Sequence, residues 1–155
     1  MSRLISKILI LTFALLSSAL SASAQDSLSV AKFFSPTPPL EGKVRLVYLS
    51  GDNLDGRDMT LFRSLLTEGS TSDVILIGDA VKTDSRLATN IKTLQSGQCL
   101  KALYIQLSPS RGKTDNRFVL FRRLEDAKAM LVYIEGPTTL DKIVNVNIKN
   151  KNTDE

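Results

Sequence analysis

The sequence predicts a single α/β domain with a largely parallel sheet. Apolar runs of strand length alternate along the chain with apolar stripes of helical spacing. One run, residues 74–77, is continuous, which is typical of a strand buried on both faces in a parallel sheet. The β-α-β-α order then implies right-handed crossover connections. A length of 155 residues suits one domain, and a hydrophobic content of 43% excludes wholesale disorder.

The first elements follow the lead-in directly. Residues 44–49 predict a strand, because apolar side chains fall on both of its faces, and residues 50–53 form a turn. A helix is expected over residues 56–67, with Gly69 as its stop. Its helical stripe consists of Met59, Leu61, Phe62, Leu65 and Leu66.

The middle of the domain repeats this alternation. The buried strand at residues 74–77 is followed by a second helix over residues 85–95, which Gly97 closes. The stripe of that helix is Leu87, Ile91 and Leu94. Residues 102–107 are apolar and fit either a helical turn or a strand.

The last part of the domain predicts strands. Residues 117–123 and 128–134 have strand-like composition, and the second run is strongly apolar. Residues 140–148 are short and ambiguous. The alternation of Val144, Val146 and Ile148 favours a strand there.

The N-terminus has the pattern of a secretory signal peptide over residues 1–24. Arg3 and Lys7 precede a short apolar run, and residues 22–24 form an A-x-A cleavage site. The run is too short for a membrane span, so no stable membrane anchor is expected after cleavage before Gln25. The protein is therefore expected to be secreted or to reside in a bacterial periplasm.

The mature chain divides into three parts. Residues 25–42 are a Pro-containing lead-in, residues 43–148 form the α/β domain, and residues 149–155 are a polar tail. No sequence feature specifies the oligomeric state.

The composition excludes several classes of protein. The chain has no His, so a Ser-His-Asp hydrolase and a His-ligated metal site are excluded. A single Cys excludes an intrachain disulfide and a zinc cluster, and no cofactor is implied. Without Arg3 and Lys7 of the signal peptide, the chain has 18 basic and 16 acidic residues, and this small net charge of +2 gives no reason to expect nucleic acid as a partner.

The order of motifs resembles the Clp-protease and crotonase superfamily, over roughly residues 43–136. In that family a strand ends in a small-residue-Gly turn, as at residues 47–51, and a helix and a buried strand follow. A loop then leads into a second helix, as at residues 78–82, and a Gly-x-x-x-Ser turn carries the nucleophile, as at residues 97–101. The resemblance implies a repeated β-β-α domain.

The resemblance also implies that the catalytic groups are missing. Lys101 occupies the nucleophile position and Val132 lies near the His position. The Gly pair of the oxyanion loop is replaced by Val81 and Lys82. The chain is therefore expected to be a non-catalytic relative that binds a protein or peptide partner. The candidate binding residues are Gly78, Asp79, Lys82 and Gln98.

Two alternatives remain open. The first is a hydrolase with an atypical Ser-Lys or Cys site, for which Lys101, Cys99 and Ser50 are the candidate catalytic residues. The second is a thioredoxin-like α/β binding module without redox activity, since the lone Cys forms no C-x-x-C motif.

Overall fold

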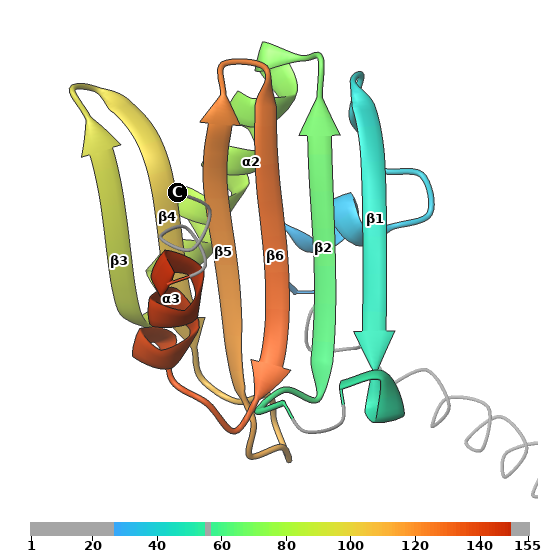
Figure 1. The fold of residues 1–155 in the computed structure, drawn as a ribbon, viewed down its shortest axis with the longest axis vertical. Coiled ribbons are helices and arrows are strands. Elements are labelled where there is room, and N and C mark those ends of the chain that lie inside the picture. Colours follow the sequence, from blue (N-terminus) through green and yellow to red (C-terminus); the bar gives the residue numbers. More distant parts are fainter. Residues whose placement is uncertain (1–26, 55–56, 150–155) are drawn as a thin grey trace, which may run out of the picture.

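The computed structural model describes residues 27–54 and 57–149, so the predicted signal peptide and the end of the polar tail lie outside the described residues. Six strands form one sheet in the order β1-β2-β6-β5-β4-β3 (Figure 1). The strands are β1 (Lys43–Ser50), β2 (Leu61–Glu68), β3 (Ala88–Ser96), β4 (Cys99–Leu107), β5 (Asn116–Glu125) and β6 (Lys128–Gly136). Every neighbouring pair in this sheet is antiparallel.

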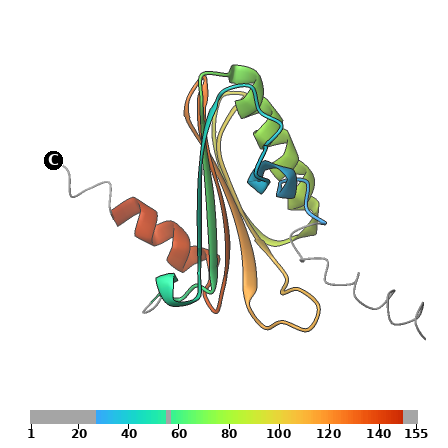
Figure 2. The same ribbon diagram turned by 90° about the vertical axis from the view of Figure 1, so that its right-hand side faces the viewer.

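Two α-helices lie on opposite faces of the sheet. The helix α2 (Thr71–Asp84) and the short 3₁₀ helix η2 (Ala31–Phe34) cover one face, and α3 (Leu140–Lys149) lies on the other (Figure 2). Two further 3₁₀ turns, η3 (Gly51–Leu54) and η4 (Ser85–Leu87), connect elements. We call the two sides the α2 face and the α3 face.

This architecture contradicts the predicted fold class. A largely parallel Clp/crotonase-like sheet is wrong, because the described strands pair only in antiparallel fashion. The thioredoxin-like alternative fails for the same reason, since its β-α-β unit joins parallel strands. Here α2 leads from β2, which lies beside the edge strand β1, to β3, the strand at the other edge of the sheet.

Four element predictions are corrected. The expected helix at residues 56–67 is largely β2, and the expected strand at residues 74–77 lies inside α2. The expected helix at residues 85–95 is η4 and β3, and the expected strand at residues 140–148 is α3. The strands predicted at residues 44–49, 117–123 and 128–134 are confirmed, and residues 102–107 are a strand.

The strand β2 has a helix-like pattern because both of its faces are covered. Leu65 is fully buried on the α2 face, and Phe62 packs against the cluster beneath α3. Apolar residues therefore occur at positions of both parities, and simple alternation is lost. In the sequence alone, such a strand cannot be told from a helix by periodicity.

The helix α2 shows the opposite case. Its continuous apolar run contains Ile75 and Leu76, which are exposed, while Val74 and Ile77 are buried. The buried positions recur at helical spacing. The side chain of Ser70 accepts a hydrogen bond from the Asp73 N–H and caps the helix.

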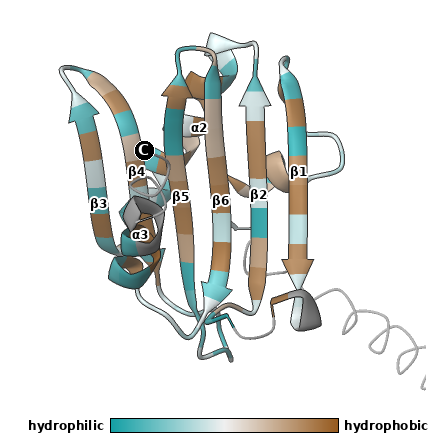
Figure 3. Ribbon diagram, in the orientation of Figure 1, coloured by the Kyte–Doolittle hydropathy of each residue, from teal (hydrophilic) through white to brown (hydrophobic). Residues whose placement is uncertain are grey.

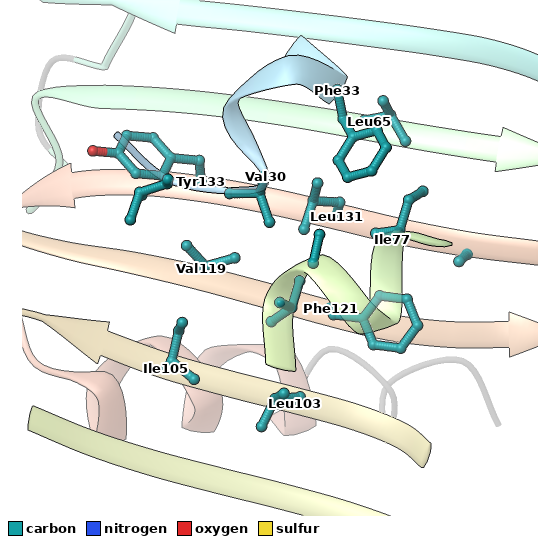
Figure 4. Packing of buried hydrophobic residues seen from close by; sticks show 14 of the residues in the cluster. Val30, Phe33, Leu65, Ile77, Leu103, Ile105, Val119, Phe121, Leu131 and Tyr133 are labelled. Carbon is teal, nitrogen blue, oxygen red and sulfur yellow. The ribbon is translucent and has the colours of Figure 1, made fainter. Parts of the chain in front are cut away.

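The main core lies between the sheet and α2. Phe121, Leu131 and Ile105 project from the central strands toward Ile77 on the helix (Figure 4). Phe33 of η2 fills the same layer beside Leu65 of β2. Hydrophobic residues recur along β2, β5 and β6, the strands at the centre of the sheet (Figure 3).

Part of the lead-in belongs to this core. Leu28, Val30 and Phe33 are buried, and Val30 and Phe33 are completely inaccessible to solvent. Two buried carboxylates at the ends of α2 bind the backbone of this segment. We call Asp73 and Asp84 the helix carboxylates.

The helix carboxylates hold the lead-in at two points. Asp84 accepts hydrogen bonds from the N–H groups of Ser29, at 2.7 Å, and Val30, at 3.1 Å. Asp73 accepts from the N–H groups of Glu41, at 3.1 Å, and Gly42, at 2.8 Å. Hydrogen bonds to ionised groups are the stronger ones, so these contacts fix both ends of the lead-in against α2.

We expect Asp84→Ala to lower the free energy of unfolding by about 2–3 kcal/mol, because a buried N–H group, of Val30, and a partly buried one, of Ser29, lose a charged acceptor. Urea unfolding followed by circular dichroism measures the change. The matched control is Asp79→Ala on the same helix, where an exposed ion pair with Lys82 contributes within about 0.5 kcal/mol. Equal losses in the two variants would contradict the role given to Asp84.

Candidate binding groove

The α3 face carries an open groove with a volume of about 710 Å³. Its floor is the sheet, one wall is α3, and the loop before β2 closes one end. Most of its lining is apolar. The lining residues are Asp58, Met59, Phe62, Ser64, Tyr104, Leu120, Arg122, Met130, Val132, Ile134, Thr138, Lys142, Ile143 and Asn145.

The wall exists because α3 packs against the sheet along only part of its length. Leu140 and Val144 are buried in a second core cluster with Phe118 and Ile134. Figure 2 shows that the helix meets the sheet at its N-terminal end and leans away from it toward its C-terminal end. The angle between helix and sheet leaves the groove open on one side.

The floor is built from one cross-strand row of side chains. Ser64 of β2 lies opposite Val132 of β6, which lies opposite Leu120 of β5. Leu120 in turn lies opposite Tyr104 of β4. Paired residues in an antiparallel sheet point to the same side, so this row forms a continuous surface. Ser64 is the small residue in the row.

The apolar surface continues from the groove onto the edge strand β1. Val47 lies opposite Ser64, and Leu49 lies opposite Phe62. The side chain of Val47 is 46% exposed. The groove is therefore the deepest part of a wider apolar strip that reaches the edge of the sheet.

Gly136 allows the closed end of the groove to form. A Cβ atom at this position would lie 2.4 Å from the carbonyl oxygen of Asp58 and 2.8 Å from the Cα of Met59. Glycine at the end of β6 therefore permits the backbone of the loop to approach. Thr60 fixes the same loop, since its N–H donates to the carbonyl oxygen of Glu135 at 2.8 Å.

The charges at the groove are few. Lys142 of α3 and Asp58 of the loop form an exposed ion pair across the rim, at 4.0 Å. Arg122 of β5 is half-buried in the lining. The two basic groups and one acidic group give the lining a net positive charge.

A separate polar cluster lies on the α2 face. The hydroxyl of Tyr133 donates to Glu135 at 2.8 Å, and Lys113 pairs with the other carboxylate oxygen at 3.5 Å. Burial, and secondarily the hydrogen bond to Glu135, raises the pKa of Tyr133 well above its usual value. Tyr133 therefore stays neutral and acts as a donor that satisfies a buried carboxylate, on the far side of the sheet from the groove.

The predicted catalytic residues do not come together. Lys101 and Cys99 lie at the start of β4, whereas Ser50 ends β1 at the opposite edge of the sheet. The Cys99 thiol accepts a hydrogen bond from Nη1 of Arg123 at 2.9 Å. Val132, at the position expected for a catalytic His, is a buried residue of the groove floor.

The predicted binding residues also lie away from the groove. Gly78, Asp79 and Lys82 are on α2, where Gly78 packs against Phe121 and the other two form an exposed ion pair. Gln98 is in the turn between β3 and β4. For Gly78, Asp79 and Lys82 the prediction is wrong about the local structure, because the resemblance implies a loop at residues 78–82 and the chain forms a helix there.

The groove residues carry no motif in the sequence. Phe62 comes from β2, which is distant along the chain from β4 and β5, the strands that carry Tyr104 and Leu120. The available signal was the two-sided apolar pattern of residues 61–66, which indicates that the second face of that strand is also covered.

Residues 27–54 and 57–149 contain no cluster of three acidic, Cys or His residues that could hold a metal ion. None of the helices described there has the length and hydropathy needed to cross a membrane.

The fold and the groove define a class of protein: a small antiparallel sheet with one helix on each face and an open apolar groove beneath the second helix. The chain belongs to the family described as Family of unknown function (DUF6108), whose model matches residues 17–147. No curated protein matches the chain. Membership of this family and the antiparallel sheet overturn the resemblance to the Clp and crotonase superfamily.

We expect Gly136→Ala to destabilise the protein by about 1–3 kcal/mol, because the added methyl group overlaps the backbone of the loop at Asp58. Thermal and urea unfolding measure the loss. The matched control is Gly78→Ala, where the new Cβ meets Phe121 at an ordinary 3.4 Å and alanine favours the helix by about 0.5–1 kcal/mol. If both variants unfold alike, the close approach at Gly136 is not limiting.

Proposed function

We propose that this protein is a secreted or periplasmic, non-catalytic binding protein whose groove holds an apolar segment of a protein or peptide partner. The observation that carries this proposal is the open, mainly apolar groove between α3 and the sheet. Concave apolar sites with a few polar groups are the usual form of binding sites.

The chemistry of the groove favours binding over catalysis. The chain has no His, and the described lining contains no Cys. Its Ser64 hydroxyl has no adjacent general base among the described side chains, because the residues opposite it are Val47 and Val132. A serine nucleophile needs such a base within hydrogen-bond reach.

The shape of the apolar surface supports an extended partner. A small molecule would be expected to be enclosed on most sides. Here the strip runs from the groove across β2 to Val47 and Leu49 on the edge strand. A peptide segment can cover the strip with several side chains and place one or two of them in the groove.

The proposal is tested with a displayed library of short random peptides, selected against protein purified from cells that express the full chain. We expect enriched peptides to be apolar and to lose at least about tenfold in affinity for Ser64→Tyr, because a larger side chain fills the floor of the groove. Isothermal titration calorimetry measures the affinity.

The matched control is Thr93→Tyr, which adds the same side chain at an exposed position of the other edge strand. It should bind the peptides like the parent protein. Selection of no peptide, or equal loss in both variants, would overturn the proposal. Circular dichroism verifies that both variants are folded.

The localisation is tested separately. We expect mass spectrometry of the exported protein to find Gln25 as the first residue, because cleavage follows the A-x-A site at residues 22–24. A chain that begins at Met1 in the membrane fraction would contradict this expectation.

A further inference from the structure

Arg122 is a basic residue of the groove lining that has no counterion among the described residues. It lies in β5 and lines the groove, half-buried. Among the described residues, its guanidinium has no hydrogen-bond or ion-pair partner. A partly desolvated guanidinium with no anion is unfavourable relative to one that is paired.

The cross-strand neighbours of Arg122 cannot satisfy it. Ala102 lies opposite on β4 and Met130 lies opposite on β6. Both side chains are apolar. Tyr104, two residues beyond Ala102 on the same face of β4, also lines the groove and brings a hydroxyl group to the same region.

No acidic side chain among the described residues lies within ion-pair distance of Arg122. Glu68 is shared by Lys128, at 3.7 Å, and Arg45, at 4.0 Å. Asp58 pairs with Lys142 across the rim, and Asp141 pairs with Lys92. The anion that would complement Arg122 must therefore come from outside the described chain.

We propose that the partner segment carries an acidic side chain, and that its carboxylate binds the guanidinium of Arg122 while neighbouring apolar side chains fill the groove. This inference rests on the proposed function and specifies the chemistry of its partner. A guanidinium presents a planar fork of donors that matches a carboxylate in two-point geometry. In an apolar groove such a pair is screened less than on an open surface.

A double-mutant cycle tests the inference on the peptides selected from the library. We expect the enriched sequences to contain Asp or Glu among apolar residues. Changing that residue to Asn or Gln in a synthetic peptide should weaken binding to the parent protein by about tenfold. The same change should have little effect on binding to Arg122→Gln, since the partner charge is then gone.

Two variants serve as controls. Arg86→Gln removes an equal charge at an exposed position of η4 and should bind like the parent protein. Arg122→Lys keeps the charge but loses the fork, so its affinity should lie between those of the parent and Arg122→Gln. Unchanged melting temperatures separate loss of binding from loss of folding.

The outcomes distinguish the two proposals. Apolar peptides that bind in the groove with no acidic residue and with equal affinity for Arg122→Gln would overturn the carboxylate inference and leave the binding function intact. Selection of no peptide, or binding that Ser64→Tyr does not change, would overturn the binding function itself. Binding of dodecanoate, displaced by no peptide, would assign the same anion site to a small amphiphile and overturn the inference as stated.

Discussion

The requirement to bury β6 on both faces governs this structure. Leu131 and Tyr133 face α2, and Val132 and Ile134 face the side of α3, so one strand joins two apolar layers. No single helix can cover both. Burial therefore requires one helix on each face of the sheet. Because α3 is short, it leaves part of the apolar surface of the α3 face uncovered. The groove is this uncovered part, which is why it is apolar and why central strands of the sheet supply its floor.

The strands β1, β5 and β6 were predictable from their apolar runs, whereas β2, α2 and β3 were not. In β6 every residue from Ala129 to Ile134 is apolar. The edge strand β3 was taken for a helix because Leu87, Ile91 and Leu94 are spaced like a helical stripe, although all three are exposed. Helical spacing of apolar residues normally marks a buried helix face, but in this segment the spaced residues are exposed and mark none. In α3, Leu140, Ile143 and Val144 form the packed stripe, and the alternation that favoured a strand was incidental.

The candidate site could not have been assembled from the sequence. Ser64 joins Arg122 and Met130 only through the pairing of β2 with β6, two strands that are far apart along the chain. Local periodicity carries no information on that pairing. One feature of the sequence did point to the site: apolar residues of β2 fall on both faces of the strand. This pattern indicates that the second face is also covered, but it does not indicate what the face binds.

The pairing of β2 with β6 also sets the order in which the chain can acquire its structure. Strands β3 to β6 form a meander of adjacent hairpins, whereas Thr60 and Glu135, which meet at the β2-β6 junction, are 75 residues apart. Closing the longer loop costs more chain entropy, so we expect the meander to form first and the β1-β2 hairpin to dock last. In the interval β6 is an unpaired apolar edge. Until β2 covers it, this edge is available for pairing with a chaperone or with another unfolded chain.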